Sequence, residues 1–247
     1  MPRLEILRLG LKSRRHRASR PPLQLTRSVL PALTKLVFDG VHGYLDDLLA
    51  QIEAPLLKYL DVAFYTDVGF VLPQLHRFIS HAESFKTRDR AKVRASARAS
   101  QLVIYRGEHW ILSLQIRCRE LDSQLPSLAK VCSSFPLLST LVRLEIVEYA
   151  PRPQWRDDME VTQGLELLDP FTAVNDLCLS DQVARRVCQA LEELAEERVT
   201  DVLPALQNIF LKDLEPSESV PKYIEKFFAA RNLSGHPVAV HRWDRTR

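Results

Sequence analysis

Apolar residues recur along this chain in a fixed order, at the first, fourth and sixth positions of a short segment. The pattern is L-x-x-L-x-Φ, where Φ is apolar, and VLPAL introduces it at both 29–33 and 202–206. Six segments fit, with first positions at Leu4, Leu33, Leu57, Leu141, Val174 and Leu206. Four have a proline two residues earlier, namely Pro2, Pro31, Pro55 and Pro204. Because proline ends helices and favours an extended residue before it, each segment is predicted to be a strand that follows a turn.

The first positions lie 24 to 33 residues apart, except for an interval of 84 residues between Leu57 and Leu141. That interval has room for three units of ordinary length. It contains strand-like runs at 91–96, 101–105 and 110–116, which lack the full pattern. We therefore expect a degenerate or irregular centre at about 85–120.

Helix-like apolar spacing fills the stretches between these strands, at 44–52, 72–82, 121–132, 182–198 and 220–231. Asp46 and Asp47 are expected in the first turn of the first helix, where the helix dipole favours acidic residues. Pro126 is expected to limit the third helix to its early turns, and Ser219 to cap the last one.

A strand, a loop, a helix and a further strand make up the plan of leucine-rich repeats, whose stacked units share one core. We predict one α/β domain over residues 1–247, an irregular leucine-rich-repeat-like solenoid with a curved parallel sheet and helices on its convex side. An ordinary α/β domain with leucine-rich strands is the alternative. The predicted shared core contains Leu7, Leu9, Leu36, Phe38, Leu60, Val62, Leu144, Ile146, Leu177, Leu179, Ile209 and Leu211.

Alternate residues of a strand face opposite sides of a sheet, so the residues between the core positions should line the concave face. The candidate partner-binding residues are Arg8, Lys35, Asp39, Tyr59, Asp61, Arg143, Glu145, Asn208, Phe210 and Lys212, with Ile6, Val37 and Asp176 beside them. Tyr59, Arg143 and Phe210 are the expected anchors, because aromatic residues and arginine dominate binding hot spots. Their loss is expected to leave folding nearly intact. A solvated face without a ligand is the alternative.

Charge is unevenly distributed, although the net charge is only +3. Residues 86–106 hold seven Lys and Arg with one acid, whereas residues 152–201 hold twelve acids with five Lys and Arg. The run 12–20 is predicted to be a flexible basic loop, with Lys12, Arg14, Arg15, Arg17 and Arg20. These basic segments suggest nucleic-acid or acidic-partner binding as an alternative function. Without interleaved aromatic residues, they are more typical of polar inserts or of pairing with the acidic region.

No catalytic or cofactor motif is recognisable: the chain has no P-loop, no G-x-G-x-x-G and no G-x-S-x-G. His76 and His81 are five residues apart, which favours a surface helix over a zinc site. The four cysteines are widely spaced and are expected to be buried thiols in a reducing compartment. We expect no cofactor, no metal and no enzymatic activity; an enzyme would need cysteine, histidine and acidic residues to converge in the fold. No membrane-length segment or signal peptide is recognised, so an intracellular location, cytoplasm or nucleus, is expected.

The order RPPLQLTRSVLPALTKLVFDGVHGYLDDLLAQIEAPLLKYLDVAFY resembles a unit of the F-box and leucine-rich-repeat proteins of mushroom-forming fungi. LLDPFTAVNDLCLSDQVARRVCQALEELAEERVTDVLPALQNIFLKDL, with FFAARNLSGHPVAVHRWDR, is similar to their C-terminal end. The resemblance implies a substrate receptor whose repeats hold a protein and whose F-box docks on a ubiquitin ligase through an adaptor. No F-box segment is recognised before the first strand, so tight adaptor binding is expected only if an F-box is supplied elsewhere. The expected function is non-enzymatic recognition of a protein ligand.

Overall fold

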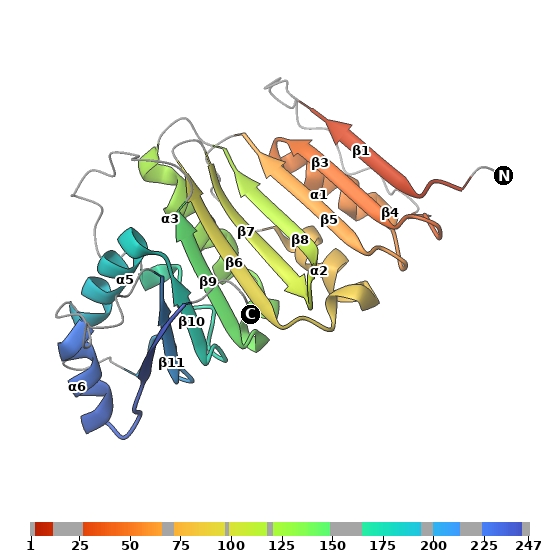
Figure 1. Ribbon diagram of the computed structural model, residues 1–247. Coiled ribbons are helices and arrows are strands. Elements are labelled where there is room, and N and C mark those ends of the chain that lie inside the picture. The colour runs from red at the N-terminus through yellow and green to blue at the C-terminus, as the bar shows by residue number, and fades with distance from the viewer. Residues whose placement is uncertain are drawn as a thin grey trace.

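The computed structural model describes residues 3–11, 27–65, 72–96, 99–117, 121–148, 165–193, 200–212 and 224–243. Ten strands form one mostly parallel sheet in the order β1-β3-β5-β8-β7-β6-β9-β10-β11-β12 (Figure 1). Their bounds are β1 (Ile6–Gly10), β3 (Lys35–Gly40), β5 (Tyr59–Phe64), β6 (Arg90–Ser96), β7 (Ala99–Arg106), β8 (His109–Ile116), β9 (Arg143–Glu148), β10 (Asp176–Leu179), β11 (Asn208–Leu211) and β12 (Ala239–Arg242). A separate parallel pair consists of β2 (Ser28–Val29) and β4 (Ile52–Glu53). The strands β2, β4 and β12 were not predicted from the sequence.

One hydrogen-bonded turn recurs immediately before the strands that carry the repeated pattern. In each case the first apolar residue of the pattern donates its backbone N–H to the carbonyl three residues earlier. The donor and acceptor pairs are Leu33 and Leu30, Leu57 and Ala54, Leu141 and Leu138, Val174 and Phe171, and Leu206 and Leu203. Pro31, Pro55 and Pro204 occupy the second position of such turns, where the fixed φ of proline is favourable. The proline noted in the sequence therefore shapes the turn that starts the strand.

The two residues after each turn fix the strand against its neighbour. The N–H groups of Thr34 and Lys35 both donate to the carbonyl of Glu5, at 2.8 and 3.1 Å. The same paired donation recurs at four further strand starts. The N–H groups of Lys58 and Tyr59 donate to Thr34, those of Val142 and Arg143 to Asp89, those of Asn175 and Asp176 to Val142, and those of Gln207 and Asn208 to Asn175. Because the bonds repeat at equivalent positions, the apolar residues of neighbouring strands fall into register.

This register creates two rows of apolar side chains across the sheet. In the first row, Leu36 lies between Leu7 and Leu60, and further along Leu177 lies between Leu144 and Ile209. All of the predicted core residues are buried except Leu7 and Leu9, which are partly exposed. These two residues were wrongly predicted to be buried, because β1 lies at the edge of the sheet and has only one described neighbour.

The centre of the sheet is irregular, as expected, but its strands are not all parallel. The strand β7 runs antiparallel to both β6 and β8, so the predicted parallel sheet is parallel only in part. The connections in this region are too short for parallel crossovers and can join only antiparallel strands. Gly107, with a φ of +57°, supplies the left-handed position of the turn between β7 and β8. The hairpins place β8 beside β5 and β6 beside β9, the reverse of their chain order.

The described helices contribute their apolar residues to a single core cluster on one face of the sheet. They are α1 (His42–Gln51), α2 (Pro73–His81), α3 (Leu121–Ser133), α5 (Asp181–Glu193) and α6 (Glu225–Leu233), with short 3-10 helices η1 (Glu83–Phe85) and η2 (Pro136–Thr140). Figure 1 shows α1, α2 and α3 behind the sheet. We call the opposite face, on which no described helix packs, the open face. The predicted cap Ser219 and the end of the helix predicted at 182–198 lie outside the described residues.

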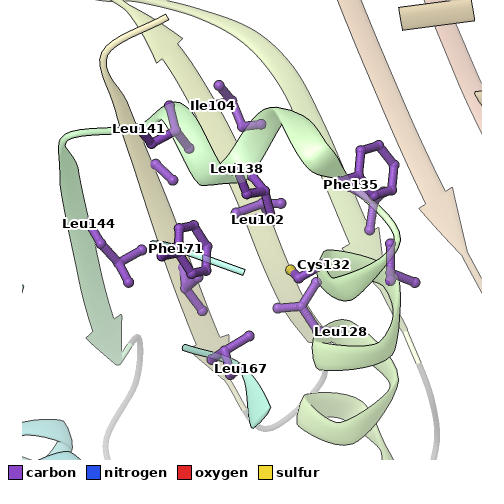
Figure 2. Packing of buried hydrophobic residues seen from close by; sticks show 14 of the residues in the cluster. Leu102, Ile104, Leu128, Cys132, Phe135, Leu138, Leu141, Leu144, Leu167 and Phe171 are labelled. Atoms are coloured by element: carbon purple, nitrogen blue, oxygen red, sulfur yellow. The ribbon is translucent and has the colours of Figure 1, made fainter. Parts of the chain in front are cut away.

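Pro126 does not end α3, which continues to Ser133. The expected early stop was wrong because the later turns bury Leu128, Val131 and Cys132 completely. Figure 2 shows Leu128 and Cys132 beside Leu102 of β7. Burying each large apolar side chain contributes about 1.5–3 kcal/mol, so together they offset the ~3 kcal/mol cost of an interior proline.

Asp46 caps a neighbouring helix instead of starting its own. Because α1 begins at His42, Asp46 lies in the second turn, and the predicted placement of the acidic pair in the first turn is wrong. The Asp46 carboxylate accepts the backbone N–H of Gln74 at 3.1 Å, next to Pro73 at the start of α2. Burial raises the pKa of Asp46, while the bond from Gln74 opposes that shift.

Replacing Leu144 by alanine is expected to lower the free energy of unfolding by about 2–5 kcal/mol, because the side chain is fully buried between two strands. Val142 is 45% exposed, so the control Val142→Ala is expected to change it by less than about 0.5 kcal/mol. Urea unfolding measures both variants. Equal effects would contradict the assignment of the core face.

Asp46→Asn is expected to stabilise the protein at neutral pH. The raised pKa means that ionising Asp46 costs free energy in the folded state, while asparagine retains an oxygen acceptor for Gln74. The wild type loses this cost progressively as pH falls through the folded pKa, which lies above the usual 3.8. Thermal unfolding across this range should therefore show a gain that shrinks towards acid pH. A gain independent of pH would refute the role of ionisation. Asp46→Ala, which leaves Gln74 without an acceptor, is the control variant.

Candidate functional site

The predicted partner-binding residues all lie on the open face. Strand pairing places Lys35 opposite Tyr59, Arg143 opposite Asp176, and Asp176 opposite Asn208. Two residues further along their strands lie Arg8, Asp61, Glu145 and Phe210. Asp39 and Lys212 continue the same alternation. Residues that are far apart in sequence are therefore aligned in transverse rows across one surface.

A carboxylate surrounded by three cations lies near the middle of the open face. Glu145 on β9 has a side chain only 8% exposed, and its Oε2 accepts from Lys92 Nζ at 2.9 Å. Its Oε1 lies 3.6 Å from nitrogen atoms of both Arg90 and Arg143. Such a buried carboxylate is tolerated only because cations surround it. We call Arg90, Lys92, Arg94, Arg143 and Glu145 the β6–β9 charge cluster.

Aromatic rings support the arginines of this cluster from both sides. The guanidinium of Arg90 lies 4.7 Å from the ring centre of Tyr105, and that of Arg143 lies 5.6 Å from the ring centre of Phe210. Arg94 Nη2 donates to the Tyr105 hydroxyl at 3.4 Å. Cation–π contacts and shared hydrogen bonds restrict these long side chains before any ligand arrives.

A second aromatic group lies on the β3–β5–β8 side of the open face. The rings of Tyr59 and Trp110 are 5.4 Å apart, and Lys35 Nζ lies 5.4 Å from the centre of the Trp110 ring. A β-bulge makes this contact possible: Ile104 pairs with Leu112 whereas Tyr105 pairs with Trp110, so Ile111 is an extra residue. The bulge changes the alternation of β8 and brings Trp110 to the open face.

Phe210 belongs to a small hydrophobic cluster on the same face, with Val147, Cys178 and Trp243. Its ring also stacks on His241, with ring centres 5.1 Å apart. Because Phe210 packs in its own cluster, we now expect its removal to lower stability, in place of the expectation that folding stays nearly intact. Tyr59 remains the better anchor for a test of binding.

Polar contacts extend the organised surface towards both ends of the sheet. Arg117 Nη1 lies 3.4 Å from Asp39 Oδ2, and its guanidinium lies over the Tyr65 ring. The hydrogen bond to Asp39 raises the pKa of the Tyr65 hydroxyl. At the other end, Asn208 donates to Asp176 at 2.9 Å. These contacts hold the predicted acidic positions in place instead of leaving them to project freely.

The described basic residues of the two segments are divided between the two sides of the sheet. The predicted basic loop with Lys12, Arg14, Arg15, Arg17 and Arg20 lies outside the described residues. Within 86–106, Arg90, Lys92 and Arg94 reach the open face, whereas Arg88 turns to the helical side and donates to the carbonyls of Leu137 and Phe85. Burial lowers the pKa of Arg88. The strand-like runs predicted at 91–96 and 101–105 are confirmed as β6 and β7, so the interpretation of the 86–106 segment as an insert is wrong.

Sequence analysis missed Arg90, Lys92, Arg94, Tyr105 and Trp110 as open-face residues. The signal for the three cations was present, because charged and small apolar residues alternate strictly from Arg90 to Ala95. The positions of Tyr105 and Trp110 depend on the reversed hairpin and the bulge, which have no fixed sequence pattern. Local alternation therefore predicts which side a residue faces, but not which strand lies beside it.

The described histidines and cysteines provide no cluster with the make-up of a metal site. His76 and His81 both lie on α2, where the Nδ1 of His81 is 2.7 Å from the carbonyl oxygen of Arg77. Burial raises the pKa of Cys132 and of Cys178 to about 12, so both thiols stay protonated. No helix in the described ranges combines the length and apolar character needed to cross a membrane.

Glu145→Gln is expected to lower the free energy of unfolding by about 1.5–3 kcal/mol, because three cations then lose their shared carboxylate. The control is Asp61→Asn on the same face, with an expected change below about 0.5 kcal/mol. Urea unfolding at constant ionic strength compares the two variants. A Glu145→Gln effect no larger than the control would show that the cluster adds no stability.

Comparison with other proteins gives no independent identification. No family model, no curated protein and no solved structure matches the chain.

Proposed function

We propose that this chain is a non-enzymatic recognition protein that binds a protein ligand on the open face of its sheet. The observation that carries the proposal is the arrangement of Tyr59, Trp110, Lys35 and the β6–β9 charge cluster on one face. Helices cover the other face and join its core. Rigid strands that present aromatic and charged side chains suit binding, because little conformational entropy is lost on contact.

The proposal includes a leucine-rich-repeat-like solenoid over residues 1–247, with the open face on its concave side. Recurring turns, paired N–H donations and shared register support repeated units. In the fungal family that the chain resembles, this region would hold a substrate for ubiquitination inside the cell. Attachment to the ligase adaptor would then depend on an F-box supplied elsewhere.

The proposal is tested by selecting ligands from a displayed peptide library on the folded protein. Tyr59→Ala is expected to weaken selected ligands by about 1–3 kcal/mol, because Tyr59 anchors the aromatic group with Trp110. The control is Arg77→Ala on α2, at an exposed position on the helical side, and it should leave affinity unchanged. Binding is measured by titration, with circular dichroism as the folding check.

Failure to select any ligand, or equal losses in the Tyr59 and Arg77 variants, would refute the open face as the recognition surface. A loss seen only when Arg14, Arg15 and Arg17 are neutralised would place the site on the basic loop. In that case the main effects should be on association rate and salt dependence.

A further inference from the structure

We infer that the open face binds an acidic peptide segment that lies in an extended conformation along β6. The inference rests on the proposed function and specifies the chemistry of its ligand. Its ligand-facing residues are Arg90, Lys92, Arg94 and Arg143. Three of these alternate along one strand and the fourth is the direct neighbour of Arg90 on β9.

The first argument is the charge balance. On the open face, β6 and β9 carry these four cations and a single carboxylate, Glu145. Glu145 lies beneath the cations, since its side chain is 8% exposed while those of Arg90, Lys92 and Arg143 are 19–27% exposed. Glu108, in the turn after β7, also lies 3.6 Å from Arg90, so four cations meet two carboxylates and this place keeps an excess of positive charge. An acidic ligand is the complementary partner.

The second argument is spacing. Alternate residues of a strand are about 6.6 Å apart, so Arg90, Lys92 and Arg94 form a row of cations at that interval. An extended peptide repeats its own alternate side chains at the same interval. Acidic residues at every second position of the ligand would thus each face a cation of β6.

The third argument is the donor capacity that remains after the internal contacts. A lysine ammonium has three donors and a guanidinium has five. Lys92 uses one donor on Glu145, and Arg90 contacts Glu145 Oε1, Glu108 Oε2 and the carbonyl of Gly107. Both can hold Glu145 and still donate to ligand carboxylates. Their position is already fixed, which reduces the entropy lost on binding.

The aromatic rings favour a peptide over a single-stranded nucleic acid. Base stacking needs an open ring face, but the described rings already have partners: Tyr105 packs with Arg90, Trp110 with Tyr59, and Phe210 with His241. Asp39, Asp61 and Asp176 also interrupt the positive surface on both sides of the cluster. A long phosphate backbone would meet these acids, whereas a short acidic segment along β6 would not.

The test uses the full chain and a short fluorescent peptide with glutamate at every second position and threonine between. Fluorescence anisotropy is expected to show salt-sensitive binding that the Lys92→Gln, Arg94→Gln double variant weakens by about tenfold or more. The matched control is Arg77→Gln, Lys130→Gln, which removes the same charge from exposed positions on the helical side. It is expected to weaken binding less than about twofold, and thermal melting checks that both variants are folded.

Three further ligands separate the alternatives. Two control peptides should bind more weakly than the alternating peptide: one of the same composition with all its glutamates in one block, and one in which each glutamate is replaced by glutamine. A thymine oligonucleotide should not bind more tightly than the alternating peptide. The inference is overturned if the alternating peptide does not bind, if both double variants lose affinity equally, if the block peptide binds as well, or if the oligonucleotide binds best. Library ligands on the open face that are not acidic would leave the proposed function standing and refute this inference alone.

Discussion

The structure depends on the register of its parallel strands, and two backbone donors at the start of β3, β5, β9, β10 and β11 set that register. In the repeated arrangement, residues such as Lys58 and Tyr59 both donate to the single carbonyl of Thr34. A shift of one residue would exchange the two faces of a strand. Leu60 would then leave the core and Tyr59 would enter it. The same bonds therefore determine both the burial of the leucines and the composition of the open face.

The reversed centre decides which charges meet. If β6, β7 and β8 followed one another in chain order, β8 would pair with β9. The two hairpins instead place β6 beside β9, so that Arg90 meets Arg143 and Lys92 meets Glu145. Two arginines side by side repel each other in isolation. The carboxylate of Glu145 lies close enough to both to offset that repulsion.

The open face is stabilised by contacts among its own residues. Val147, Cys178 and Trp243 form a small apolar cluster there, although no described helix covers it. Rings and carboxylates hold the cations of the charge cluster in defined positions. A surface ordered in this way loses little freedom when a ligand arrives. In the proposed function, its positive centre and acidic surroundings would restrict the ligands that fit.

The sequence by itself determined the strands with the repeated pattern, the main helices and the side of the sheet on which each predicted open-face residue lies. Those features follow from short-range rules: proline shapes a turn, and alternation assigns a face, as for Leu144 and Arg143. Leu7 shows the limit of such rules, because its burial depends on whether a strand lies on each side.

Only the tertiary structure decided the continuation of α3 through Pro126, the reversal of the central strands and the assembly of the β6–β9 charge cluster. In α3 the burial of apolar side chains outweighs a local preference. The cluster joins Lys92 to Glu145 across 53 residues of chain. Strand neighbours are chosen by the packing of the whole sheet, so no local pattern in either segment specifies that they meet.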